Sequence, residues 1–222
     1  MNPSAGELFR SSLWPLVRGA LTGTIPLSLI SFILGLLLAL TLALMRLSGN
    51  RWLASVARVY ISIVRGTPLL VQLFVIFYGL PSIGILINPW PSAVLAFSLN
   101  VGGYAAEVIR AAILSVPRGQ WEAAYMIGMS RRRSLTRIIL PQAARVSVPP
   151  LSNTFISLVK DTSLASLILV TELFREAQQV AAFSQEFMLL YLEAALVYWV
   201  ICLALSSTQS ALERRLDRYV AR

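Results

Sequence analysis

Two adjacent charges, Lys160 and Asp161, interrupt an otherwise apolar stretch over residues 151–170. Neighbouring residues on a helix point about 100° apart, so these two side chains cannot neutralise each other face to face. Each charge needs a partner on another helix, another chain, water or a substrate. Charges at membrane depth are costly and usually face a cavity. We therefore predict that Lys160 and Asp161, together with the polar Gln72 and Asn100, line a translocation path.

A further acid, Glu107, precedes Arg110 by three positions. This spacing places both side chains on one face of a helix, close enough to pair. Two interpretations are open: an ion pair at the inner interface, or a role of Glu107 in the translocation path.

Several classes of chemistry are excluded by composition. The chain has no His, and its single cysteine, Cys202, lies in an apolar run that suits a small buried hydrophobe. The sole lysine, Lys160, follows Val159, whereas a Walker A loop needs Gly-Lys before Ser or Thr. The chain is therefore expected to have no catalytic residue, no metal ligand and no cofactor of its own. If ATP drives its activity, the ATPase is a different polypeptide.

The elements that position these residues are membrane spans. Of the 222 residues, 57% are hydrophobic and only 13% are charged, whereas soluble domains are typically about 25% charged. The sequence predicts an all-α, polytopic membrane protein that forms a single domain over residues 1–222, with about five transmembrane helices. Residues 1–20 are expected to form an amphipathic segment at the membrane surface. The predicted spans cover residues 25–45, 68 to 80–86, 92–113, 151–170 and 187–206.

The distribution of positive charge predicts the orientation. Arg46, Arg51, Arg58 and Arg65 follow the first span with no acid among them, and the outer turn at residues 79–91 has no Lys or Arg. Residues 171–186 lean acidic, and the C-terminal segment is Arg-rich through Arg218 and Arg222. The positive-inside rule then places the N-terminus outside and the C-terminus in the cytoplasm. The net charge of +9 is accounted for by these loops, so no nucleic-acid partner is predicted.

A polar, Arg-rich loop over residues 118–145 separates the third and fourth spans. It is predicted to form two short helices, with Gly128 as the left-handed residue that ends the first. Ser130 is the expected N-cap of the second helix, and Pro141 should end or kink that helix near Leu140. An ordinary helical hairpin between two spans is the simpler alternative.

The spacing within this loop resembles the coupling loop, or EAA loop, of permease subunits in ABC importers. Several fixed positions at fixed spacing make the resemblance specific. The matching residues are Glu122, Ala123, Ala124, Gly128, Ile138, Leu140 and Pro141. The resemblance implies that these residues couple the chain to an ATPase.

Other segments extend the resemblance to the polar amino acid permeases of this class, and within them to bacterial L-cystine permeases. The segments are residues 65–74, 105–110, 119–124, 140–146, 149–153 and 157–164. The resemblance implies a type I importer (MetI-like) permease fold in the bacterial cytoplasmic membrane. The implied partners are membrane lipid, a second permease subunit (expected to be a second copy of this chain), an ABC ATPase that holds ATP and Mg, and an extracytoplasmic amino acid-binding protein.

The sequence leaves alternative functions open. The substrate could be another polar amino acid of the Gln, Glu, Arg or His type. A self-contained carrier could couple transport to protons or sodium through Glu107 and Asp161, although the inverted repeat typical of such carriers is not evident. A membrane anchor without transport activity would leave Lys160 and Asp161 unexplained.

Overall fold

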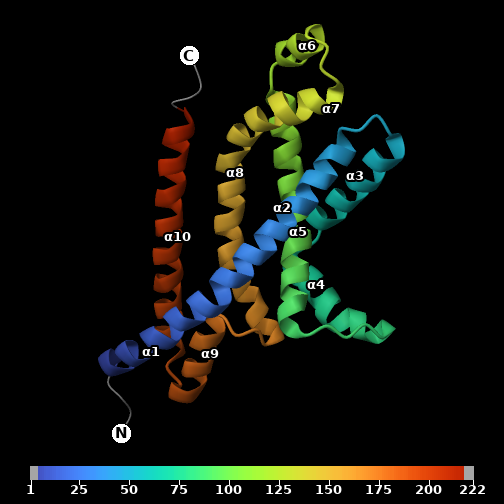
Figure 1. The fold of residues 1–222 in the computed structure, drawn as a ribbon. Helices are drawn as coiled ribbons and strands as arrows, with labels where there is room; N and C mark the ends of the chain where they lie inside the picture. Colours follow the sequence, from blue (N-terminus) through green and yellow to red (C-terminus); the bar gives the residue numbers. More distant parts are fainter. Residues whose placement is uncertain (1–4, 218–222) are drawn as a thin grey trace.

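The computed structural model describes residues 5–217, which are helical with no strand, as the sequence predicts (Figure 1). The expectations for Arg218 and Arg222, and for the first four residues, lie outside this range. The α-helices are α1 (Ala5–Gly19), α2 (Ile25–Arg46), α3 (Arg51–Gly66), α4 (Leu69–Phe74), α5 (Pro89–Ser115), α6 (Arg118–Met126), α7 (Arg131–Ser134), α8 (Leu140–Asp161), α9 (Leu173–Ser184) and α10 (Phe187–Asp217). Shorter π-helical turns cover Ala20–Thr24, Val75–Gly79 and Leu135–Ile139, and 3-10 turns cover Leu80–Ile83 and Thr162–Ile168.

The number of spans agrees with the sequence prediction. In the described range, three helices are long and apolar enough to cross a membrane: Ala5–Arg46, Pro89–Ser115 and Phe187–Arg215. Two further helix pairs meet this standard when each bent pair is taken as one span, which brings the total to five. The two pairs are Arg51–Gly66 with Leu69–Ile83, bent by 106°, and Arg131–Ile168 with Leu173–Ser184, bent by 48°.

The N-terminal segment is not the separate surface segment that the sequence predicts. Helix α1 continues into α2 through the π-helical turn, and together they form one helix of 42 residues. One face of α1 is buried against α9 and α10. A Cβ placed on Gly23 would lie 2.6 Å from the Cα of Glu172, so only glycine permits this close approach. Contact with α9 and α10 therefore extends the first span toward the N-terminus.

The second span is broken and short. The Arg-rich stretch after α2 is itself a helix, α3, and the chain then turns sharply before Leu69. Fifteen residues follow in helical turns up to Ile83, a length of about 22 Å, compared with about 30 Å of bilayer hydrocarbon. Pro68 causes part of the bend, because proline removes a backbone donor and disfavours helix at the preceding residue.

The fourth span begins earlier than the sequence predicts, and Pro141 does not separate the second loop helix from it. Pro141 lies in the first turn of α8, where the lack of an N–H is tolerated, and the π-helical turn Leu135–Ile139 joins α7 to α8. Pro149 and Pro150 lie inside α8. The helix therefore begins before residue 151, and Lys160 and Asp161 occupy its last turn rather than its middle.

The last two elements pack against the N-terminal helix. The acidic segment predicted as an outer loop contains helix α9, which contacts α1 and α10. Glu172 is fully buried and caps α9 by accepting from the backbone N–H of Arg175 at 2.7 Å. Its other oxygen accepts from Thr24 at 3.3 Å and Tyr198 at 2.8 Å. This network joins α2, α9 and α10.

The central packing partner is α5, which contacts α2, α3, α4 and α8. The crossing of α2 and α5 is close because small residues face bulky ones. A Cβ on Gly35 would lie 2.6 Å from the side chain of Val101, and one on Gly102 would lie 2.6 Å from Leu38. Phe97, fully buried, fills the core beside them. Such small-residue contacts hold helices together where lipid provides no hydrophobic driving force.

Candidate functional site: a loop at one end and a polar cavity between the spans

The Arg-rich loop forms the predicted pair of helices. Helix α6 ends at Gly128, whose φ of +76° is the left-handed conformation expected of it. The N–H of Gly128 donates to the carbonyl of Tyr125 at 2.9 Å, and that of Met129 donates to Ala124 at 3.0 Å. These two bonds form a Schellman motif, which ends the helix sharply. Ser130 then takes the extended N-cap conformation before α7, but its side chain makes no capping bond.

A small hydrophobic cluster attaches this loop to the membrane helices. Ile139 is fully buried in this cluster among residues of α5 and α8. Ala124 on α6 is also buried, at 1% exposed, but is not part of the cluster. Ile138 and Leu140 flank Ile139 and pack against the same cluster, as does Trp121. A displacement of the loop therefore pushes directly on α5 and α8.

The tip of the loop is apolar and exposed. The exposed fractions are 52% for Tyr125, 87% for Met126 and 74% for Ile127. Glu122 and Ala123 on the same helix are also exposed. Sequence reasoning missed the three apolar residues, although an apolar triplet just before a helix-ending glycine in a polar loop was a usable signal.

A polar cavity of about 420 Å³ lies between α4, α5 and α8. Asp161, partly buried, and Asn100 line it from α8 and α5. Gln72 accepts a hydrogen bond from Asn100 at 3.1 Å and donates to the carbonyl of Val64 at 2.8 Å. It therefore links the cavity wall to the end of α3 and holds the bend before α4. The structure thus brings together three of the residues predicted for the path.

Other polar residues of this cavity were missed from the sequence. Asn153 and Ser157 line it beside Asp161, at intervals of four residues on α8. This spacing places them on one helix face and could have been recognised. Tyr104 follows Asn100 by four residues on α5 and could have been recognised in the same way. Thr67 precedes the bend before α4, and only the tertiary structure brings it to the cavity.

Lys160 does not share the cavity with Asp161. It lines a second cavity of about 500 Å³ with Tyr191, Tyr198 and Trp199 of α10. Neither Lys160 nor Asp161 forms a salt bridge within residues 5–217. The prediction that the two side chains diverge is confirmed.

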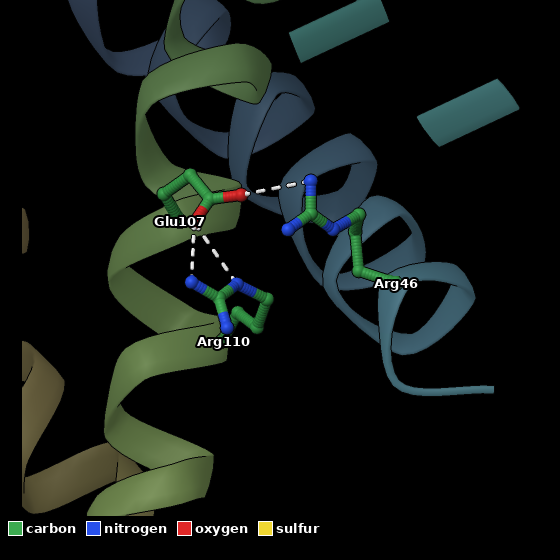
Figure 2. A network of polar contacts seen from close by, with 3 residues as sticks. All are labelled: Arg46, Glu107 and Arg110. Carbon is green, nitrogen blue, oxygen red and sulfur yellow. Dashed lines mark hydrogen bonds and ion pairs between the residues drawn. The ribbon is translucent and has the colours of Figure 1, made fainter. Parts of the chain in front are cut away.

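Glu107 lies two turns from Asn100 along α5, outside the polar cavity, and both of its oxygens are engaged (Figure 2). Oε2 accepts from Nε and Nη2 of Arg110 at 2.9 and 2.8 Å, and Oε1 lies 3.5 Å from Nη1 of Arg46. The arrangement favours the ion-pair interpretation, because it ties the end of α2 to α5. Beside it, the guanidinium of Arg65 lies 5.5 Å from the centre of the Tyr104 ring.

Comparison with known proteins identifies the class of this site. The family described as binding-protein-dependent transport system inner membrane component matches residues 31–218. The chain belongs to this family. The comparison therefore assigns the chain to the inner-membrane components of binding-protein-dependent transport systems.

Individual members of the family are similar over nearly their whole length. The L-cystine transport system permease protein TcyB of Bacillus subtilis (strain 168) is 59% identical over 97% of this chain and 93% of its own. The glutamine transport system permease protein GlnP of Escherichia coli (strain K12) is 36% identical over 93% of this chain and 96% of its own.

Solved structures agree with the fold. A chain of an amino acid ABC transporter, crystallised with histidines, matches with a TM-score of 0.85 and 35% identity over 90% of this chain and 94% of its own. A chain of the MetNI methionine ABC transporter in an inward-facing conformation matches with a TM-score of 0.72 over 94% of this chain and 96% of its own. At 17% identity, the second match supports the fold alone.

The contrast between Asp161 and Glu172 generates a prediction. Asp161→Asn and Lys160→Met should leave the yield of folded transporter near wild type, because a cavity solvates both groups, but should lower transport several-fold. Glu172→Ala should instead reduce the yield of folded transporter, since it leaves the hydroxyls of Thr24 and Tyr198 and the backbone N–H of Arg175 without an acceptor. Each buried unsatisfied group lowers the free energy of unfolding by about 1–3 kcal/mol.

The measurements are the monodisperse peak in size-exclusion chromatography and uptake by proteoliposomes. If yield and uptake fall together in Asp161→Asn, that residue is structural, and its assignment to the path is wrong.

Proposed function

We propose that this chain is the membrane-spanning subunit of an ATP-driven importer of L-cystine. The choice of L-cystine as the substrate rests on the 59% identity to the L-cystine permease of Bacillus subtilis across 97% of the chain. The main alternative is another polar amino acid, because the family also includes permeases named for glutamine and nopaline.

The polar cavity is compatible with such a substrate. Cystine carries amino and carboxylate groups at both ends, and the cavity offers the carboxylate of Asp161, the amide of Asn100 and the hydroxyl of Ser157. An ammonium group of the substrate would pair with Asp161, while the amide and hydroxyl groups can accept or donate. Substrate or water would thereby supply the solvation that Asp161 lacks within the chain.

The energy source is a separate ATPase, which we propose docks on the coupling loop. The exposed tip formed by Tyr125, Met126 and Ile127 gives a partner protein an apolar surface to cover. ATP and Mg belong to that ATPase, and this chain needs no cofactor. ATP binding closes the ATPase pair, and the loop passes the movement to α5 and α8 as a rigid-body shift that alternates access to the cavity.

Two further partners complete the proposed transporter. A second copy of this chain would help to enclose the polar path, since about five spans cannot readily surround one alone. An extracytoplasmic binding protein would deliver the amino acid at the opposite end.

In the proposed orientation, the loop and the C-terminus lie in the cytoplasm, and the N-terminus lies outside the cell membrane. Arg-rich segments gather at one end of the molecule, where α6, α7, the end of α2 and the end of α10 lie (Figure 1). The opposite end carries the turn after α4 and helix α9. The positive-inside rule supports a cytoplasmic position for the Arg-rich end.

The decisive experiment reconstitutes the chain with its ATPase and binding protein in liposomes. We expect ATP-dependent uptake of labelled L-cystine, with a tenfold excess of glutamine, glutamate, arginine or histidine competing weakly. Strong competition by one of these would reassign the substrate. Uptake by the chain alone under a proton or sodium gradient would instead establish the secondary carrier.

Coupling through the loop is tested at Gly128. Gly128→Val forces a β-branched residue into positive φ at a cost of about 1–3 kcal/mol, so the turn between α6 and α7 should distort. We expect several-fold less co-purifying ATPase and ATP-driven uptake.

Gly84→Val is the matched control, because Gly84 also has positive φ, +84°, but lies in the turn after α4. It should retain ATPase binding. Normal coupling in Gly128→Val would count against the assignment of this loop.

The topology is tested with single cysteines after Cys202→Ser. In intact cells, Ser82→Cys should react with an impermeant thiol reagent, and Arg132→Cys should react only after permeabilisation. Both side chains are exposed, so burial does not confound the comparison. The reverse pattern would invert the proposed orientation.

A further inference from the structure

A third cavity, of about 710 Å³, lies where the coupling loop meets the membrane helices. The ends of α2 and α5 form one side of it, and the start of α6 together with α7 forms the other. It is separate from the polar cavity at Asp161 and shares none of its residues. Its position places it at the boundary between hydrocarbon and cytoplasm in the proposed orientation.

Three arginines, Arg118, Arg131 and Arg132, line this cavity, and no acidic residue does. All three are exposed, and within residues 5–217 none of them forms a salt bridge. By contrast, Arg46 and Arg110 nearby are paired with Glu107. The cavity therefore holds a local excess of positive charge that no described residue neutralises.

The rest of the lining is apolar. Leu44 and Leu47 come from α2, and Ile113 and Leu114 come from α5. Trp121 also lines the cavity, and its amphipathic ring suits a site at a membrane interface. A ligand that fills this cavity would need an anionic head and an apolar body.

We propose that this cavity binds an anionic phospholipid, with its phosphate between Arg118, Arg131 and Arg132 and an acyl chain along the leucines of α2. Guanidinium groups match phosphate oxygens in geometry and charge, and basic pockets between spans on the cytoplasmic side suit such headgroups. A free phosphate would leave the apolar wall uncovered. The bound lipid would brace the loop against α2 and α5 and make coupling sensitive to membrane composition.

The ATPase is a less suitable occupant than lipid. Arg118 is the first residue of α6, at the base of the loop, and Met126 is the last. Eight residue steps separate them along the helix axis, about 12 Å. None of the tip residues Tyr125, Met126 and Ile127 lines the basic cavity, so the apolar tip and the cavity are different surfaces. The lipid proposal rests on the cytoplasmic position of the loop but needs neither ATPase nor substrate.

The test uses the purified, delipidated full chain and native mass spectrometry with dioleoylphosphatidylglycerol or dioleoylphosphatidylcholine. Wild type should bind phosphatidylglycerol preferentially. The variant Arg118→Gln/Arg131→Gln/Arg132→Gln should bind it at least about tenfold more weakly, because it lacks the three guanidinium groups that attract the phosphate. Its weak binding of phosphatidylcholine should not change.

The matched control is Arg133→Gln/Arg137→Gln/Arg145→Gln, which removes the same charge from exposed positions outside the cavity. It should retain binding within about twofold. Equal losses in both variants would show diffuse attraction and overturn the site. Displacement of the lipid by millimolar inorganic phosphate would reassign the cavity to a free anion.

A protein role is distinguished by co-purification. If the cavity variant binds phosphatidylglycerol normally but loses the ATPase, the arginines serve the partner protein, and the lipid proposal is wrong. Failure of cystine uptake with intact lipid binding would contradict the proposed function alone.

A second measurement does not depend on the folding of the triple variant. Brominated phosphatidylglycerol should quench tryptophan fluorescence more than brominated phosphatidylcholine does, and Trp121→Phe should abolish the difference. Equal quenching by the two lipids in wild type would overturn the site.

Discussion

The close crossing of α2 and α5 is the constraint on which the other elements depend. Inside a bilayer, apolar side chains gain nothing by leaving lipid for one another, so helices associate through tight contact and buried polar bonds. Gly35 against Val101 and Gly102 against Leu38 provide the tight contact. The ion pair of Arg46 with Glu107 joins the end of α2 to α5. With α2 fixed on it, α5 offers its remaining faces to α3, α4 and α8.

This packing separates the two charges at the end of α8. Asp161 faces the cavity toward α5, and Lys160 faces the aromatic side chains of α10. A helix that packed on one neighbour only would have left one of these charges in lipid, where it would cost several kcal/mol. Placement of α8 between α5 and α10 lets each charge line a cavity of its own.

Much of the fold could be predicted from the sequence, and the errors share a physical cause. The apolar runs predicted the spans, and Gly128 predicted the end of α6, because both signals are local. The predicted start of the fourth span at residue 151 and the predicted surface segment at residues 1–20 were wrong because tertiary contacts override local preference. Neighbouring helices stabilise α8 despite its prolines, and contact with α9 turns α1 into an extension of α2.

Part of the candidate site could also be predicted, because some of its residues give a local signal in the sequence. Asp161, Gln72 and Asn100 stood out as polar groups in apolar stretches, and the structure brings them to one cavity wall or its support. Thr67 gave no local signal, since its part in the cavity depends on the bend between α3 and α4. Glu107 gave the same signal as Asp161, yet both of its oxygens are occupied by arginines.

The helices that line the polar cavity are also the ones attached to the coupling loop. Asn100 lies on α5 and Asp161 on α8, and the cluster around Ile139 holds both helices to α6 and the π-helical turn. From Leu140 to Asp161, α8 spans about 32 Å as one helix. Pro149 and Pro150 remove two N–H donors from the middle of α8, yet the helix continues through them from Leu140 to Asp161. The loop is thus attached directly to the two helices that carry Asn100 and Asp161, so the packing of the loop bears on both walls of the polar cavity.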